Sequence, residues 1–126
     1  MGRKKFEMCQ IRFDDNKTLD EKILSMFSTE NLLNCFSDEH VDEYQKIFDD
    51  PRVKTLLHDE DLMQTIKILF ERGFNKISTV SNQAYIHRNT MLYRIQKIKT
   101  LIGLDVRNFD HAMAIKNLLV IRDRVY

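Results

Sequence analysis

Apolar residues recur at helical spacing along most of the chain, from Thr18 onwards. Spacings of three and four residues predict amphipathic helices with one buried face rather than strands. The first 17 residues depart from this pattern, because their apolar alternation breaks at Cys9-Gln10. We interpret them as an irregular arm or the tail of an upstream domain. The pattern as a whole predicts an all-α protein.

Three start signals divide the next 40 residues into short helices. Thr18 to Glu21 fits a capping box, and Ser37 is a cap for a helix near 38–48. Asp50-Pro51 starts a third helix, since proline suits the first helical position. The positions expected inside are Ile23, Leu24, Phe27, Val41, Tyr44, Ile47, Phe48, Val53, Leu56 and Leu57, with a separate apolar cluster at Leu32, Leu33 and Phe36.

The second half of the chain predicts longer helices. One begins near residue 60, a short one covers 78–84, one covers 88–101 and the last follows residue 108. The boundary signals are a cap at Asp59 or Asp61, a stop at Gly73, a stop at Gly103 and a cap at Asn108. The expected inner positions are Leu62, Met63, Ile66, Leu69, Phe70, Met113, Ile115, Leu118, Leu119 and Ile121.

Composition excludes several classes of protein. Only 3 glycines and 1 proline argue against turn-rich all-β folds. No apolar run approaches the roughly 18 residues of a membrane span, and no signal-peptide core is present. The 2 cysteines form no CxxC pair, which indicates a reducing compartment. These features predict a cytoplasmic protein with no membrane partner.

The net charge of +1 conceals two halves of opposite sign. Residues 1–63 carry nine Lys/Arg and fifteen Asp/Glu, whereas 64–126 carry eleven and four. No acidic residue lies between Glu71 and Asp105. A segment with one sign of charge is either a solvated helix face or a surface for a polyanion.

The region 78–101 has the arrangement of a helix-turn-helix: a short helix, a turn of about three residues and a longer helix. Helices that cross steeply need small or apolar residues where they touch. That requirement is met by Val80, Ser81, Ala84, Ile86, Met91 and Ile95. His87 stands at the cap of the longer helix, where serine or aspartate would be stronger, which indicates a further role for its side chain.

The longer helix is expected to present a polar face to solvent. A rotation of about 100° per residue puts four apolar residues on one side: Met91, Ile95, Ile98 and Ile102. The opposite side carries Asn89, Tyr93, Gln96 and Thr100, with Lys97 beside it and Arg88 at the N-terminal tip. Arginine pairs with guanine, Asn or Gln with adenine, and lysine with phosphate, so this face suits the DNA major groove. A solvated helix in a bundle is the alternative interpretation.

The run HRNTMLYRI at 87–95, followed by TLIGLD at 100–105, resembles the C-terminal helix-turn-helix domain of PucR-type bacterial regulators. The resemblance is strong over 62–125 and weak over 36–57. It implies a Fis-like helical bundle and transcriptional control, with an upstream ligand-sensing or dimerising region. The family usually has alanine at Ser81 and leucine at Ala84, so the first helix of the motif is expected to pack more loosely. Phe74-Asn75-Lys76 also replaces a usual Gly-Asn.

Carried over by position, the resemblance assigns DNA-contacting roles to eight residues. Arg88 and Asn89 would face base edges. The backbone contacts would come from His87, Thr90, Tyr93 and Arg94, and from Lys76 and Ser78 at the first helix; Gln96 and Lys97 complete the predicted site. Alternatives stay open for three of them. Arg94 could pair with an acid near Asp61, Tyr93 could cover the helix surface, and His87 could be a neutral cap.

The sequence thus predicts sequence-specific binding of double-stranded DNA for bacterial transcriptional regulation, at the nucleoid, by a homodimer with recognition helix 88–101. A protein–protein interaction or dimerisation module that uses the motif only as scaffold is the alternative. Three parts are expected: an arm at 1–17, an acidic helical segment at 18–58 and the helix-turn-helix domain at 59–126. No phosphate loop, nucleophile elbow or HExxH motif occurs, and Cys35 with His40 does not complete a zinc site. We therefore expect no enzymatic activity, cofactor or metal.

Overall fold

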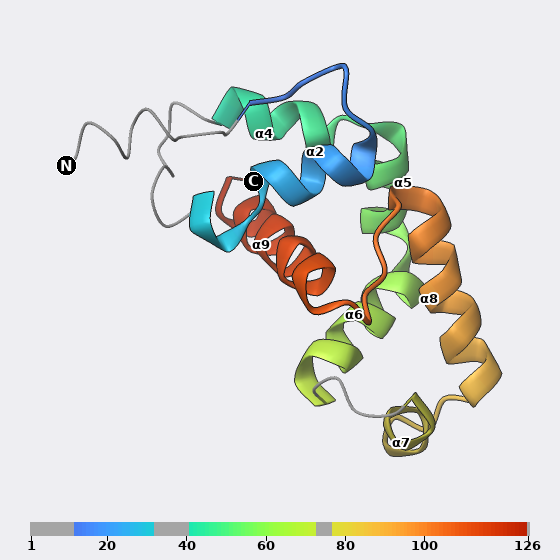
Figure 1. The fold of residues 1–126 in the computed structure, drawn as a ribbon. Coiled ribbons are helices and arrows are strands. Elements are labelled where there is room, and N and C mark those ends of the chain that lie inside the picture. Colours follow the sequence, from blue (N-terminus) through green and yellow to red (C-terminus); the bar gives the residue numbers. More distant parts are fainter. Residues whose placement is uncertain (1–11, 32–40, 73–76, 126) are drawn as a thin grey trace. The chain divides into compact units, whose positions relative to one another are not determined.

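A computed structural model describes residues 12–31, 41–72 and 77–125 of the chain, and all regular structure there is α-helix (Figure 1). The main helices are α2 (Leu19–Met26), α4 (Val41–Phe48), α5 (Pro51–His58), α6 (Glu60–Arg72), α7 (Ile77–Gln83), α8 (Arg88–Ile102) and α9 (Phe109–Val125). The predicted all-α class is confirmed. The apolar cluster at 32–36 and the stop at Gly73 lie outside the described residues.

The helix ends follow local capping chemistry. At α2, the Glu21 carboxylate accepts from the Thr18 N–H at 3.3 Å, which forms the predicted capping box. At α6, the cap is Asp59 rather than Asp61, because the Leu62 N–H donates to Asp59 Oδ1 at 3.1 Å. Gly103 ends α8 in the left-handed region with φ 76°, a conformation that costs glycine least.

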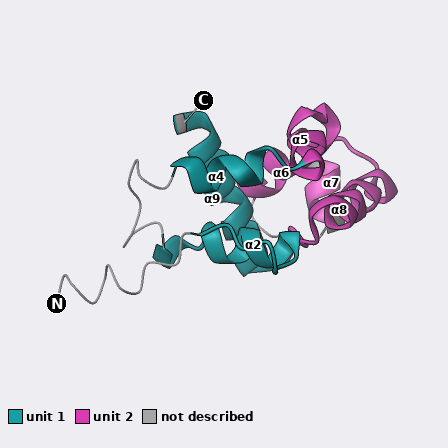
Figure 2. Ribbon diagram, turned by 90° about the horizontal axis from the view of Figure 1, so that it is seen from above, with its two compact units in different colours: residues 1–50, 108–126 teal, residues 51–107 magenta. Residues whose placement is uncertain are grey.

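The chain divides into two compact units, residues 1–50 with 108–126 (unit 1) and residues 51–107 (unit 2) (Figure 2). In the described part of unit 1, α2 packs against α4 and α9. The Phe27 ring lies 5.0 Å from that of Tyr44 and 6.0 Å from that of Phe48, centroid to centroid. The Asn117 side chain on α9 donates to the Phe27 carbonyl at 2.8 Å, so α9 satisfies an end group of α2.

Unit 2 is organised around α8, which contacts α5, α6 and α7. Its buried apolar residues are Val53, Leu56, Leu62, Ile66, Leu69, Val80, Met91, Ile95, Ile98, Ile102, Leu104 and Val106. Several residues expected inside are only half-buried, among them Leu57, Met63, Phe70, Met113 and Leu119. The predicted division at residue 59 stays a prediction.

Candidate nucleic-acid interface

The turn between α7 and α8 is tightly hydrogen-bonded. The Ile86 N–H donates to the Ser81 carbonyl at 2.9 Å, and the Tyr85 N–H donates to the Asn82 carbonyl at 3.3 Å. This pair of bonds is the Schellman pattern that ends many helices, and it requires a left-handed residue in the position of Tyr85. Tyr85 has φ 58° there, although glycine is the usual occupant. Its side chain is 97% exposed.

The two helices of the motif run in clearly different directions and meet through small and apolar side chains (Figure 1). Val80 on α7 and Met91 on α8 are fully buried. Ser81 is buried beside them, and its hydroxyl has no hydrogen-bond partner. The helix-turn-helix arrangement predicted for 78–101 is therefore present, with helix boundaries shifted by one residue.

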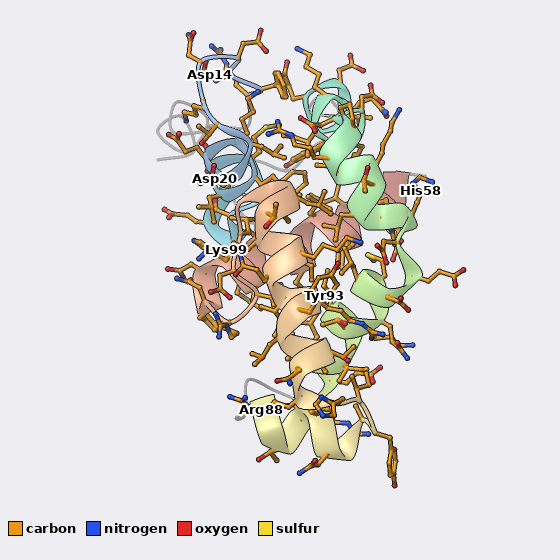
Figure 3. The ribbon with its side chains drawn as sticks, turned by 90° about the vertical axis from the view of Figure 1, so that its right-hand side faces the viewer. Asp14, Asp20, His58, Arg88, Tyr93 and Lys99 are labelled. Atoms are coloured by element: carbon orange, nitrogen blue, oxygen red, sulfur yellow. The ribbon has the colours of Figure 1, made fainter. Side chains whose placement is uncertain are left out.

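The N-terminus of α8 is capped by His87, as predicted. The ring Nδ1 accepts the Asn89 N–H at 3.1 Å, so the ring proton of the neutral imidazole is on Nε2. The next residues, Arg88, Asn89 and Thr90, are exposed. Arg88 lies at the α7 end of α8, with Tyr93 and Lys99 further along the helix (Figure 3). The tip of α8 thus presents a cation, an amide and a hydroxyl to solvent.

The side of α8 opposite its buried residues carries neutral polar groups. Asn89, Tyr93, Gln96 and Thr100 are all exposed, and Tyr93 is 65% exposed. The Thr100 hydroxyl donates to the Gln96 carbonyl at 3.0 Å, which leaves its oxygen lone pairs toward solvent. We call these four residues the outer stripe. The stripe contains hydrogen-bond donors and acceptors but no carboxylate.

Two cations flank the outer stripe on the side that faces α6, and both are ion-paired. An Arg94 Nη lies 3.7 Å from Asp61 Oδ1, and the other Nη donates to Gln64 Oε1 at 3.4 Å. Lys97 Nζ lies 3.4 Å from Asp59 Oδ2. The arrangement left open for Arg94, a pair with an acid near Asp61, is the one in the structure.

Two carboxyl groups of unit 2 are held in the ionised form. The Leu62 N–H, with the Lys97 ammonium as a smaller contributor, lowers the pKa of Asp59. The Arg107 guanidinium is the main group that lowers the pKa of Asp105. Unit 2 has ten Lys/Arg and five Asp/Glu, a balance of +5. Its surface is therefore cationic overall, although part of that charge is paired internally.

Two predicted site residues cannot be placed. Lys76 lies outside the described residues, and so does the side chain of Ser78, whose backbone is in α7. A cavity of about 540 Å³ lies elsewhere, in unit 1, and no predicted DNA-binding residue lines it. Its lining consists of Leu24, Ser28, Thr29, Asn108, Phe109, Asp110, His111, Met113 and Ala114.

Within the described ranges, no cluster of three His, Cys, Asp or Glu side chains is placed to hold a metal ion. Over the same residues, no helix combines the length and apolar character needed to cross a membrane.

Sequence reasoning missed two features of this site. Sequence reasoning gives Tyr85 no role, and its left-handed backbone and exposed ring are found only in the structure. The pair between Lys97 and Asp59 joins residues 38 positions apart, which helical periodicity within one element does not reveal. The second feature depends on the tertiary packing of α8 against α6.

Comparison with known proteins finds a match that runs from the first turn of α6 into α9. Residues 62–120 match the PucR C-terminal helix-turn-helix domain. This chain is 39% identical over 59 residues to the carbohydrate diacid regulator of Escherichia coli K12, and 29% identical over 58 residues to the purine catabolism regulatory protein of Bacillus subtilis 168. The resemblance found in the HRNT and GLD runs is confirmed.

The two matches span less than half of this chain and a small part of each regulator. They cover 47% and 46% of this chain but only 15% and 11% of the two regulators. No solved structure matches the chain significantly. The matched domain is that of regulators and not of enzymes, in agreement with the expectation that the chain is not an enzyme.

Proposed function

We propose that the PucR-type helix-turn-helix domain of this chain binds double-stranded DNA in a sequence-specific way and regulates transcription, with α8 as the recognition helix. The observation that carries the proposal is the outer stripe of α8. It combines amides, a phenol and a hydroxyl without a carboxylate, on a helix exposed along the length of that face. The edges of base pairs in the major groove offer the complementary donors and acceptors.

The tip of α8 supports the same proposal. Arg88 and Asn89 occupy the first two positions of the helix and are exposed. Arginine and asparagine make bidentate contacts with guanine and adenine, which are the base contacts of greatest discrimination. The oriented N–H groups of the first turn of a helix, together with the hydroxyl of Thr90, favour a phosphate. We assign base reading to Arg88 and Asn89 and backbone contacts to His87, Thr90 and Tyr93.

A single motif reads only a few base pairs, so we expect a homodimer on two half-sites about one helical turn apart. The acidic residues before α5 are our candidate for the dimer contact, because their charge would repel DNA. We also propose a bacterial cytoplasmic, nucleoid-associated location. Control by a ligand-sensing region beyond the matched domain is a further proposal, since the domain is a small fraction of each regulator it resembles.

The first test is selection of random duplex DNA by the purified protein at roughly 0.15 M salt, followed by sequencing. An enriched inverted repeat would support both sequence-specific binding and the dimer. Without enrichment by a protein whose helical circular dichroism is intact, the interaction-module alternative would be favoured.

Arg88→Ala then tests the assignment on the enriched site. We expect a loss of about 1–3 kcal/mol in binding free energy and a relaxed preference at one base position. Lys54→Ala is the matched control, because Lys54 is an exposed cation on α5 in the same unit. Equal effects of the two substitutions in a binding titration would contradict the placement of Arg88 in the groove.

A further inference from the structure

The cations of α8 differ in what surrounds them. Arg94 and Lys97 each have a carboxylate from the start of α6 within 4.0 Å. Arg88 at the tip of α8 has no such acidic neighbour among the described residues. The helix therefore carries four cations. Arg88 lies near the proposed base-reading groups, Arg94 and Lys97 are paired along the α6 side, and Lys99 is exposed in the last turn.

The two pairs differ in burial, because the Lys97 and Asp59 side chains are 43% and 24% exposed. The Arg94 side chain is only 17% exposed, whereas its partner Asp61 is 73% exposed. The arginine is thus drawn against α6 while the acid stays open to water. Asp59 uses one oxygen to cap α6 and the other to receive Lys97, so its geometry is fixed from two sides.

We propose, on the basis of the proposed function, that Asp61 and Asp59 are intramolecular counter-ions that compete with DNA phosphate for Arg94 and Lys97. Carboxylate and phosphate offer the same kind of paired oxygen acceptors to a guanidinium. Each pair must be exchanged for a phosphate contact before its cation contributes to binding. Contacts with phosphate supply nearly all non-specific affinity for duplex, so the two acids limit binding to DNA of any sequence.

The strength of exposed ion pairs permits this exchange. Such pairs are worth up to about 1 kcal/mol, which corresponds to a factor of about five in a dissociation constant. The acids therefore weaken the use of Arg94 and Lys97 without preventing it. The outer stripe, which contains no charge, is unaffected.

The test compares Asp61→Asn with the parent in binding to random-sequence duplex over a range of salt concentrations. We expect binding tighter by about two- to fivefold for the variant. We also expect the slope of log affinity against log salt to steepen by up to about 0.9, the contribution of one additional phosphate contact. Glu60→Gln is the matched control, because Glu60 is an exposed acid on the same turn of α6 and pairs with no cation in the described chain.

Three results distinguish the possibilities. Equal affinities and slopes for the Asp61 and Glu60 variants would overturn the inference, since general charge would then explain any gain. If the gain of Asp61→Asn disappears in the Arg94→Ala background, the competition acts through that arginine. If neither the parent nor Asp61→Asn binds any duplex, the proposed function itself fails and the inference fails with it.

Asp59→Asn is the second variant, in case Asp61→Asn alters folding. Asparagine is as good a helix cap as aspartate, so α6 keeps its first turn. We expect the same steepening of the salt slope, now dependent on Lys97. A slope equal to that of the Glu60 control would count against the inference.

Discussion

Ser81 places a hydroxyl inside the helix-turn-helix without a hydrogen-bond partner. A buried hydroxyl loses its hydration, and that loss is uncompensated when no acceptor or donor replaces water. The position lies in α7, which packs against α8, and the resemblance to PucR-type domains implies alanine there. The unpaired Ser81 hydroxyl therefore lowers the stability of the motif at the contact between α7 and α8.

We expect Ser81→Ala to raise the free energy of unfolding by about 1 kcal/mol, from removal of the unpaired hydroxyl and from the higher helix propensity of alanine. Urea unfolding followed by circular dichroism measures the change. Ser78→Ala is a useful comparison, since it makes the same chemical change one turn earlier. A destabilised Ser81→Ala protein would mean that the hydroxyl has a partner, such as a buried water.

Tyr85 has a backbone conformation that costs residues other than glycine about 1–2 kcal/mol. Tyr85→Gly relieves that cost but increases the entropy of the unfolded chain, so we expect a net gain below about 1 kcal/mol. Tyr85→Ala is the control, because its Cβ keeps the strain. If both variants gain equally in thermal unfolding, relief of strain is not the cause.

Single residues were predictable where the reason is local and unpredictable where it is not. The buried residues of α8 and the role of His87 as a cap follow from periodicity and helix-end chemistry. The ion-pair partners of Arg94 and Lys97 were harder to predict from the sequence. An acid near Asp61 was foreseen only as an alternative, and Asp59 was seen as a cap but not as an ion-pair partner.

At the scale of elements, one carboxylate at the start of α6, that of Asp59, has two structural roles. Asp59 caps the helix and binds Lys97, and the Leu62 N–H is the main group that lowers its pKa. Because the folded state holds the proton less tightly than the unfolded state, ionised Asp59 stabilises the protein at neutral pH. That contribution is fully present above the ordinary aspartate pKa of about 4 and is lost as pH falls through the lowered value.

We therefore expect the free energy of unfolding to decline below about pH 4, with α6 among the elements affected. Asp59→Asn should be less stable than the parent at neutral pH, and its acid decline should be shallower. Urea unfolding at several pH values tests this. Asp20→Asn serves as a comparison at another first turn. Parallel pH profiles for the parent and Asp59→Asn would show that the ionised carboxylate of Asp59 does not contribute.

Helix limits were well predicted wherever a capping residue marks them. The capping box of α2, the proline at the start of α5, the glycine after α8 and Asn108 before α9 are all found in the structure. The choice between Asp59 and Asp61 as the cap of α6 was not predictable, since both are aspartates and either can cap a helix. It is decided by which carboxylate reaches the Leu62 N–H, and in the structure this is Asp59, whereas α8 supplies a cation to both aspartates.

At the scale of the whole molecule, the matched domain and the compact units do not coincide. The match runs to residue 120, so it includes most of α9. In the structure, α9 packs against α2, and Asn117 bonds to Phe27 at 2.8 Å and to Thr29 at 3.1 Å. Periodicity gives each helix an inner face but does not say which helix will cover it. The packing of α9 against α2 could therefore not be predicted from the sequence.

We expect a fragment of residues 59–126 to be less stable than the full chain, because the inner face of α9 would lose α2. Sedimentation and urea unfolding should show self-association or a lower midpoint. Residues 18–126 form the matched control, which lacks the arm but keeps α2. If the short fragment equals this control in both measurements, α9 does not depend on α2.

The tyrosines of this chain give it an intrinsic optical reporter. The chain has no tryptophan, so tyrosine emission is not lost by energy transfer to an indole. Of its 4 tyrosines, Tyr44 is buried in unit 1, while Tyr85 and Tyr93 are open to solvent in the turn and on the outer stripe. Bases that stack on Tyr85 or Tyr93 would quench the fluorescence of these rings. Binding of duplex DNA could then be monitored in real time without a dye or an added label.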